Sequence, residues 1–263
     1  MRLERTGGQY SMKDILKSEG PNPNLYQTTL ENLVYTVSPF VPPNVIITVP
    51  HDGLYERELS LSDLSPRQSG VKVRDVGVWP IVWDLLTKHQ TPVGVVRGLV
   101  PRTHVDYNRN AIEAYENPLF SETHKYYHAM ISGMLNAADP SQRKSVGRLL
   151  IDLHGFTRQP DQVGLPEGGY DLILGTQHGR TAQEDVSRRF GDFFMNRGYK
   201  VYIPEEVEKD GEMYEGGFTI GQYAKYMDCI QVEIARKYRD SEQGRDIGPR
   251  LSQDLNEFIA SIS

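Results

Sequence analysis

The sequence has one cysteine, Cys229, and lacks both long apolar runs and a basic tract. A single cysteine excludes a disulfide within the chain and a cysteine-rich metal site. The apolar runs are far shorter than the roughly 20 residues that cross a bilayer. Residues 1–20 are polar and lack the apolar stretch of a signal peptide. We therefore expect a cytoplasmic protein with no membrane partner.

Positive charge is also scarce. The 29 lysine and arginine residues are outnumbered by 35 aspartate and glutamate residues, the net charge is −6, and the basic residues are scattered. Binding to nucleic acid needs a basic stripe or patch that follows the phosphates. We therefore expect no nucleic-acid partner, and nothing in the composition indicates an oligomeric state.

The length of 263 residues and a hydrophobic fraction of 38% suffice for a substantial core. We find no internal repeat and no low-complexity tract that would divide the chain. Residues 1–30 show no clear periodicity and are expected to form an N-terminal arm. The sequence thus predicts a single domain over residues 1–263.

Short apolar runs rich in β-branched residues recur along the chain, at 44–50, 92–100, 147–154, 170–176, 198–204 and 228–234. Near-continuous apolar runs are typical of strands that are buried on both faces. Amphipathic helical segments lie between several of them, at 75–89, 121–137, 181–197 and 248–261. This alternation predicts an α/β fold with three layers, α/β/α, around a mostly parallel mixed sheet.

Polar residues cluster where the expected strands end. His51 follows the run 44–50, the segment 102–109 follows the run 92–100, and His154 ends the run 147–154, while Glu233 lies within the run 228–234. Sheets of this kind bind their ligands at the carboxyl ends of the strands. The sequence therefore predicts a functional site at this edge of the sheet.

His51 and His154 are candidate zinc ligands. Each is followed within two residues by a glycine, which lets the chain turn and leaves the imidazole at the rim of the sheet. Zinc binds neutral imidazoles together with a carboxylate and keeps one position open for water. The residues alone leave the third ligand open among Asp52, Glu56, Glu58 and Asp75. Asp152, two residues before His154, is a candidate to orient a metal ligand without itself contacting the metal.

Glu233 is a carboxylate inside an otherwise apolar strand. Beside a metal it would act as a general base and accept a proton from water. The alternative is an ion pair with Arg236 or with a lysine of a loop.

The segment PRTHVDYNRN (101–110) offers a clamp for a carboxylate. A guanidinium group presents a planar fork that matches a carboxylate with two hydrogen bonds. Arg102, Asn108 and Arg109 would supply this clamp, with Asp106 holding one of the arginines in place. The alternative is a solvated, charged loop.

Seven short motifs follow one another along the chain, namely PHDG (50–53), RTHVDYNR (102–109), HKYYH (124–128), DLHGF (152–156), LGTQHG (174–179), YEGG (214–217) and IQVEIAR (230–236). Their order resembles that of the N-formylglutamate amidohydrolase family, which is related in fold to the zinc carboxypeptidases. The resemblance covers roughly residues 44–240.

The resemblance implies a hydrolase with a zinc-carboxypeptidase-like (phosphorylase/hydrolase-like) fold and one zinc ion per chain. Its reaction would be cleavage of the amide bond of an N-acyl amino acid such as N-formylglutamate. By motif position, His51 and His154 are metal ligands and Glu233 is the catalytic general base. Asp75 matches an aspartate that opens the next helix in the family, and it is favoured over Glu56 as the third ligand.

The same resemblance assigns the substrate carboxylate to Asn108 and Arg109, helped by Arg102. It places Tyr214 and Gly217 in the wall of the substrate pocket. The chain departs from the family at Asp52, which replaces a serine. It departs again after Asp75, where an aromatic–histidine pair is missing, and this implies a different acyl pocket.

Two other functions fit the same residues. A carboxypeptidase-like or cell-wall peptide hydrolase would use the acidic, tyrosine-rich segment 205–226 as the lip of a larger pocket. A binding module would keep the fold and would have lost the metal and catalysis. The expected partner is accordingly a small N-acyl amino acid or a short peptide.

Overall fold

A computed structural model of the protein describes residues 25–29, 34–39, 43–53, 65–89, 91–135, 148–157, 169–203, 214–239 and 248–262. Its strands are β1 (Leu25–Thr29), β2 (Val34–Pro39), β3 (Val45–Val49), β4 (Gly94–Gly98), β5 (Leu149–Phe156), β6 (Leu172–Gly175), β7 (Val201–Tyr202) and β8 (Asp228–Ala235). Its α-helices are α2 (Val78–Asp84), α3 (Ser121–Met134), α4 (Glu184–Met195), α5 (Phe218–Tyr223), α6 (Arg236–Arg239) and α7 (Gly248–Ile262). A π-helical turn (Leu85–His89) extends α2, and a 3-10 turn (Pro118–Phe120) precedes α3.

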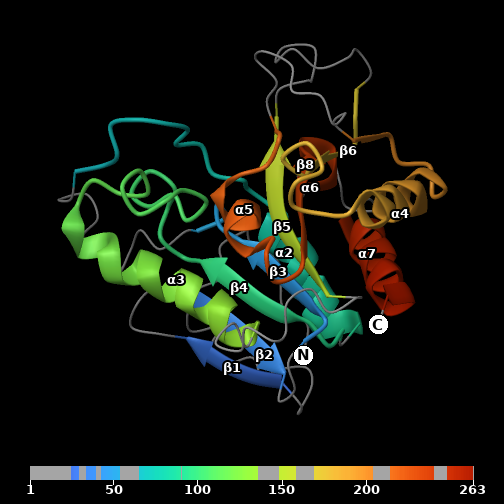
Figure 1. Ribbon diagram of the computed structural model, residues 1–263, viewed down its shortest axis with the longest axis horizontal. Helices are drawn as coiled ribbons and strands as arrows, with labels where there is room; N and C mark the ends of the chain where they lie inside the picture. The colour runs from blue at the N-terminus through green and yellow to red at the C-terminus, as the bar shows by residue number, and fades with distance from the viewer. Residues whose placement is uncertain are drawn as a thin grey trace, which may run out of the picture.

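Within these residues the eight strands form one sheet in the order β1-β2-β4-β3-β5-β8-β6-β7. Four neighbouring pairs are parallel, namely β3 with β4, β3 with β5, β5 with β8, and β6 with β7. The other three pairs are antiparallel. Strands β5 and β8 run side by side through the middle of the sheet (Figure 1). The carboxyl ends of β3, β5 and β8 therefore meet at one edge.

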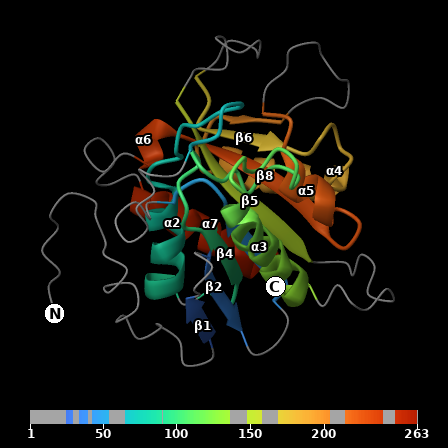
Figure 2. The ribbon, with the colours of Figure 1, turned by 90° about the vertical axis from the view of Figure 1, so that its left-hand side faces the viewer.

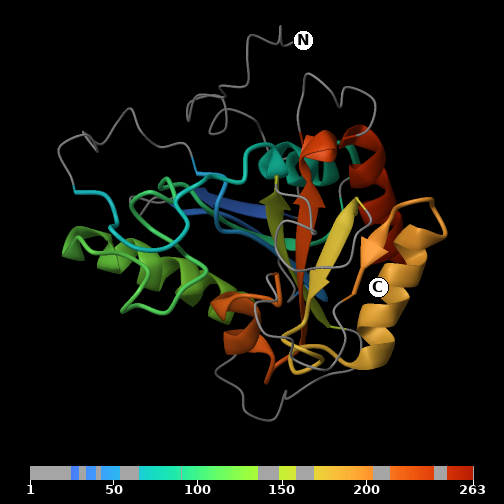
Figure 3. The same ribbon diagram turned by 90° about the horizontal axis from the view of Figure 1, so that it is seen from above.

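Helices cover both faces of the sheet. Helices α3 and α5 lie on one face, and α2 and α7 lie on the other (Figures 2 and 3). Helix α4 packs beside α7, where the rings of Phe190 and Phe258 are 4.7 Å apart. The predicted three-layer α/β/α class with a mostly parallel mixed sheet is confirmed.

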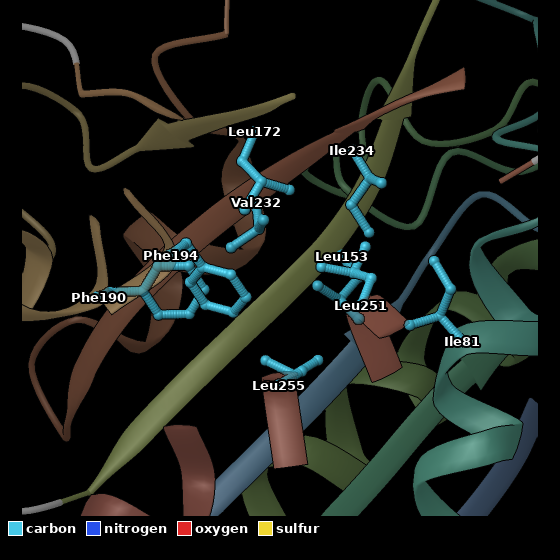
Figure 4. A pocket seen from close by; sticks show the side chains of 9 residues that line it. All are labelled: Ile81, Leu153, Leu172, Phe190, Phe194, Val232, Ile234, Leu251 and Leu255. Carbon is cyan, nitrogen blue, oxygen red and sulfur yellow. The ribbon is translucent and has the colours of Figure 1, made fainter. Parts of the chain in front are cut away.

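The face of the sheet toward α2, α4 and α7 is apolar. Leu153 of β5 and Val232 of β8 point into the same region as Ile81 of α2, Phe190 of α4 and Leu255 of α7 (Figure 4). The space left among these side chains is about 10 Å³. A water molecule needs roughly 10–15 Å³, so this layer is a close-packed core.

The opposite face carries polar side chains. Successive residues of a strand alternate between the two faces. Asp152 and His154 of β5 point away from the core that contains Leu153, and Gln231 and Glu233 of β8 point away from the core that contains Val232. The register places His154 beside Glu233 in neighbouring strands. Buried polar residues thus line the face toward α3 and α5.

Some elements differ from the expectations. Residues 25–29, within the expected N-terminal arm, form the edge strand β1, and residues 34–39 form β2. Residues 1–24 of that arm lie outside the described residues. The expected strand 198–204 is short, with ladder pairing at Val201 and Tyr202 alone. None of the described helices has the length and apolar character needed to cross a membrane.

Candidate metal centre and active site

The three predicted metal ligands lie close together near the carboxyl ends of the strands. His51 follows β3, His154 lies in β5, and Asp75 precedes α2. The Nδ1 atoms of the two histidines are 3.0 Å apart. One oxygen of Asp75, Oδ2, lies 3.3 Å from Nδ1 of His51 and 3.2 Å from Nδ1 of His154. All three side chains are buried, and their ligand atoms form a compact group that could hold a metal ion.

The Nε2 nitrogen of each histidine forms a hydrogen bond with a carboxylate other than that of Asp75. Nε2 of His51 lies 2.6 Å from Oδ1 of Asp106, and Nε2 of His154 lies 2.9 Å from Oδ2 of Asp152. A carboxylate accepts a hydrogen bond, so the ring proton of a neutral histidine resides on Nε2 and the lone pair of Nδ1 faces inward. Two lone pairs and a carboxylate oxygen that meet at one point form a group that could hold a cation.

The pKa directions agree with this arrangement. Burial lowers the pKa of His154, but the charges and hydrogen bonds of Asp152 and Asp75 outweigh burial and raise it well above its usual value. Burial raises the pKa of Asp75, but its hydrogen bonds to His154 and His51 prevail and hold it well below the usual range. In the absence of a metal ion, the cluster therefore favours a proton where the cation would bind.

The spacing of the three ligand atoms fits zinc. A tetrahedral zinc ion with nitrogen and oxygen ligands at about 2.0–2.1 Å keeps neighbouring ligand atoms roughly 3.3–3.4 Å apart. The observed separations of 3.0, 3.2 and 3.3 Å are close to this value. Two histidines and one carboxylate leave the fourth position open, which is the pattern of catalytic zinc sites.

Asp106 links the histidine to two arginines. Its Oδ2 atom lies 3.2 Å from Nε of Arg102 and 3.4 Å from Nη1 of Arg67. Burial raises the pKa of Asp106, but His51, Arg102 and Arg67 outweigh burial and hold it well below its usual range. Asp106 therefore remains ionised and fixes the ring of His51. Its contact with an arginine was predicted, whereas its contact with the histidine was not.

Asp52, which departs from the family motif, holds the chain around Asp75. Its Oδ2 atom accepts a hydrogen bond of 2.7 Å from the backbone N–H of Trp79 in the first turn of α2. The buried guanidinium of Arg97 donates to the carbonyl of Asp52 at 2.8 Å. The backbone N–H of Asp75 donates to the carbonyl of His51 at 3.0 Å. The segment that carries one ligand is thus tied to the segment that carries another.

Glu233 lies beside His154 on the neighbouring strand. It is buried, and its Oε1 atom accepts a hydrogen bond of 2.9 Å from Nε2 of Gln231. Burial raises the pKa of Glu233, with the opposing charge of His154 as the next largest influence. A carboxylate with a raised pKa next to a metal centre is suited to accept a proton from water near neutral pH.

The predicted carboxylate clamp is only partly assembled. Nη1 of Arg102 lies 3.9 Å from Oδ1 of Asp75, which places this guanidinium beside the candidate metal ligands. Nδ2 of Asn108 donates to Gln231 at 3.1 Å and lies 3.2 Å from Nε2 of His154. The side chain of Arg109 is 49% exposed and lies 3.9 Å from Oε2 of Glu113. The structure brings Arg102 and Asn108 to the centre but not the guanidinium of Arg109.

Tyr214 and Gly217 flank the same region. The backbone N–H of Gly217 donates to Oε1 of Gln231 at 2.7 Å. A Cβ atom on Gly217 would lie only 2.1 Å from Nδ2 of Asn108, so the close approach requires glycine. The ring of Tyr214 lies 5.9 Å from the ring of Phe156.

The sequence analysis missed two residues of the site, Gln231 and Arg67. Gln231 joins Asn108, Gly217 and Glu233, and the period of two between positions 231 and 233 in one strand was the signal that could have found it. Arg67 carries no such signal. Of the other acidic candidates for the third ligand, Asp52 binds the backbone of Trp79 and is not part of the ligand group, and Glu56 and Glu58 lie outside the described residues.

His104 and His128 contact neighbouring side chains and backbone groups. His104 lies beside the ring of Phe120 at 5.7 Å and within 2.9 Å of the hydroxyl of Thr103. His128 binds the carbonyl of Tyr107 and the hydroxyl of Tyr223, each at 3.1 Å.

The sequence model of one family, N-formylglutamate amidohydrolase, matches residues 113–238. The resemblance to this family is confirmed. The matched range contains His154, Tyr214, Gly217 and Glu233. It begins after His51, Asp75 and the segment 102–109. The assignment of these residues to the site therefore rests on the geometry described above. A comparison with proteins of curated function finds no match.

Two solved structures share the fold of the chain. The N-formylglutamate amidohydrolase from Ralstonia eutropha JMP134 superposes with a TM-score of 0.63 and 16% identity, over 88% of this chain and 97% of that chain. A gene product of Agrobacterium tumefaciens superposes with a TM-score of 0.56 and 13% identity, over 88% of this chain and 94% of that chain. At these identities the likeness to the amidohydrolase structure concerns the fold.

Proposed function

We propose that the protein is a zinc-dependent hydrolase that cleaves the amide bond of N-acyl amino acids, the reaction class named by the N-formylglutamate amidohydrolase family. One observation carries the proposal. Two buried histidines and Asp75 direct three ligand atoms to one point, and Asp106 and Asp152 hold the histidines in the orientation that a metal requires.

His51, Asp75 and His154 would hold the ion. Zinc held by these residues would supply Lewis-acid chemistry, since it would polarise the amide carbonyl and lower the pKa of water. Glu233 accepts the proton of the attacking water and delivers it to the departing amine. The hydrogen bond from Gln231 fixes the carboxylate of Glu233 for this transfer.

The substrate carboxylate binds to Arg102, with Asn108 and Arg109 as further contacts. The position of the guanidinium of Arg102 beside Asp75 supports its part. The burial of Asn108 between Gln231 and the backbone N–H of Thr219 supports a fixed orientation of its amide. The part of Arg109 rests on the family motif. Tyr214 and Gly217 shape the wall of the same pocket.

The first test measures metal content and activity together. Purified protein is expected to hold about one zinc ion per chain. After metal loading it should hydrolyse N-formyl and N-acetyl amino acids faster than short peptides. Preference for peptides would favour a carboxypeptidase-like hydrolase. Protein that neither holds nor takes up a metal would instead be a binding module.

The second test changes Glu233 to glutamine. Loss of a general acid–base group lowers turnover by roughly 100- to 10,000-fold. Metal content should remain as in the unmodified protein because Glu233 is not a ligand. Full turnover by the Glu233→Gln variant with metal bound would show that another group is the base.

A further inference from the structure

A second cavity opens at the carboxyl ends of β5 and β8. It is lined mainly by Phe156, Tyr170, Ala235, Arg236 and Lys237 and has a volume of about 230 Å³. A cavity of roughly 150 Å³ is enough for a benzene ring. The space therefore accommodates an aromatic ring together with the group that links it to the rest of a molecule.

The cavity continues the same face of the sheet as the metal centre. Phe156 follows His154 by two residues in β5, and Ala235 follows Glu233 by two residues in β8. Two residues of a strand span about 7 Å and return to the same face. The cavity thus begins about 7 Å beyond the pair of His154 and Glu233.

The opposite direction along β8 leads to Asn108. Gln231 precedes Glu233 by two residues on this face and accepts the hydrogen bond of the Asn108 amide. Along this face of β8, position 231 therefore lies beside Asn108, position 233 carries the proposed general base, and position 235 lines the cavity. A substrate that lies along this strand with its carboxylate at the Asn108 end directs its acyl group into the cavity.

The walls of the cavity combine two aromatic rings, those of Phe156 and Tyr170, with two cationic side chains, those of Arg236 and Lys237. Phe156 packs against Tyr214, and Tyr170 packs against Tyr202 at 5.2 Å between ring centroids. The ammonium group of Lys237 is paired with the carboxylate of Asp171. Aromatic rings favour a further ring in an edge-on or offset contact, and a guanidinium group also contacts aromatic faces, so the walls suit an aromatic group.

We propose that this cavity binds the acyl group of the substrate and selects an aromatic acyl group, of the size of benzoyl, over formyl or acetyl. The inference rests on the proposed amide hydrolysis. A formyl group has two non-hydrogen atoms and would leave the cavity unfilled.

The experiment compares the metal-loaded protein on N-formyl-, N-acetyl- and N-benzoylglutamate. The benzoyl substrate is expected to show a kcat/KM about 10- to 100-fold above that of the acetyl substrate, from burial of the ring. Benzoate should also inhibit at a concentration about 10-fold below that of acetate. Equal or better use of the formyl and acetyl substrates would overturn the inference and leave the proposed function intact. No turnover of any of the three would overturn the proposed function and, with it, this inference.

The Ala235→Leu variant narrows the cavity, and the matched control is Ala129→Leu on the exposed side of α3. The ratio of benzoyl to acetyl kcat/KM should fall about 10-fold or more in Ala235→Leu and stay as in the unmodified protein in Ala129→Leu. An unchanged ratio in a folded Ala235→Leu variant would overturn the assignment of the cavity. If that variant does not fold, the inhibition by benzoate and acetate decides, since it uses the unmodified protein.

Discussion

Replacing Asp106 with asparagine tests the proposed metal centre most directly. The change keeps the shape of the side chain and removes the negative charge that faces Nε2 of His51 at 2.6 Å. Loss of a carboxylate that orients a ligating histidine typically weakens metal binding by about 10- to 100-fold. We expect a loss in this range, which corresponds to roughly 1.4–2.7 kcal/mol of binding free energy.

The same variant should also lower the free energy of unfolding in the absence of metal. Arg67 is 3% exposed and pairs with Asp106, while Arg102 is 14% exposed. Removing one partner of a buried ion pair costs about 3–5 kcal/mol. Arg67 keeps its hydrogen bonds to the carbonyls of Val71 and Arg102, so a loss near the lower end is expected.

Asp152→Asn provides the matched comparison. Asp152 holds His154 in the same way, but it accepts its other hydrogen bond from the hydroxyl of Thr48 and not from an arginine. Both variants should bind zinc more weakly in competition with a chromophoric chelator. In urea unfolding with excess chelator, Asp106→Asn should lose more stability than Asp152→Asn. If Asp106→Asn bound zinc as tightly as the unmodified protein, the reasoning on histidine orientation would be refuted.

Three further predictions follow from the same contacts. Gly217→Ala should displace the Asn108 amide and cost about 1–3 kcal/mol of stability, whereas Gly133→Ala in α3, where a Cβ meets nothing within 4 Å, should be neutral or stabilising in thermal unfolding. Burial lowers the pKa of His128 to about 4, so its contribution to stability is complete above pH 6.5 and is lost as the pH falls toward 4. That loss is about 1–3 kcal/mol. In urea unfolding, His128→Gln should reduce the fall in the free energy of unfolding between pH 6.5 and pH 4. An unchanged fall would show that other groups cause it. Zinc at 100 times its dissociation constant should stabilise the chelator-treated protein by roughly 2.7 kcal/mol, and a thermal melt unaffected by zinc would contradict the site.

The sequence predicted the central part of the sheet well, because β3, β4, β5 and β8 are near-continuous apolar runs. It missed the edge strand β1 and its neighbour β2. An edge strand needs less apolar sequence, and β1 is polar in part. The short helices α5 and α6 span fewer than two full turns and have too little periodicity to be recognised.

For the site, the residue types at strand ends led to His51, His154 and Glu233. The choice of Asp75 depended on the family resemblance, because several acidic residues follow His51 in the chain and only the fold decides which one returns to it. The exposure of the Arg109 guanidinium was not foreseeable, since a motif fixes the order of residues and not the direction in which each side chain points. The contact between Asp106 and His51 likewise depends on a turn of the loop after β4.

Strand β8 makes the catalytic arrangement depend on the apolar core. Gln231 and Glu233 face the proposed metal centre, while Ile230, Val232 and Ile234 alternate with them on the other side. A shift of the strand by one residue would turn every side chain to the opposite face. Glu233 would then enter the apolar layer formed by Leu251 and Leu255, and the aliphatic side chains of β8 would leave that layer. The cost of that exchange fixes the position of Glu233 beside His154 before any ligand is present. Mutations that weaken packing beneath the sheet should therefore impair catalysis without touching a catalytic residue.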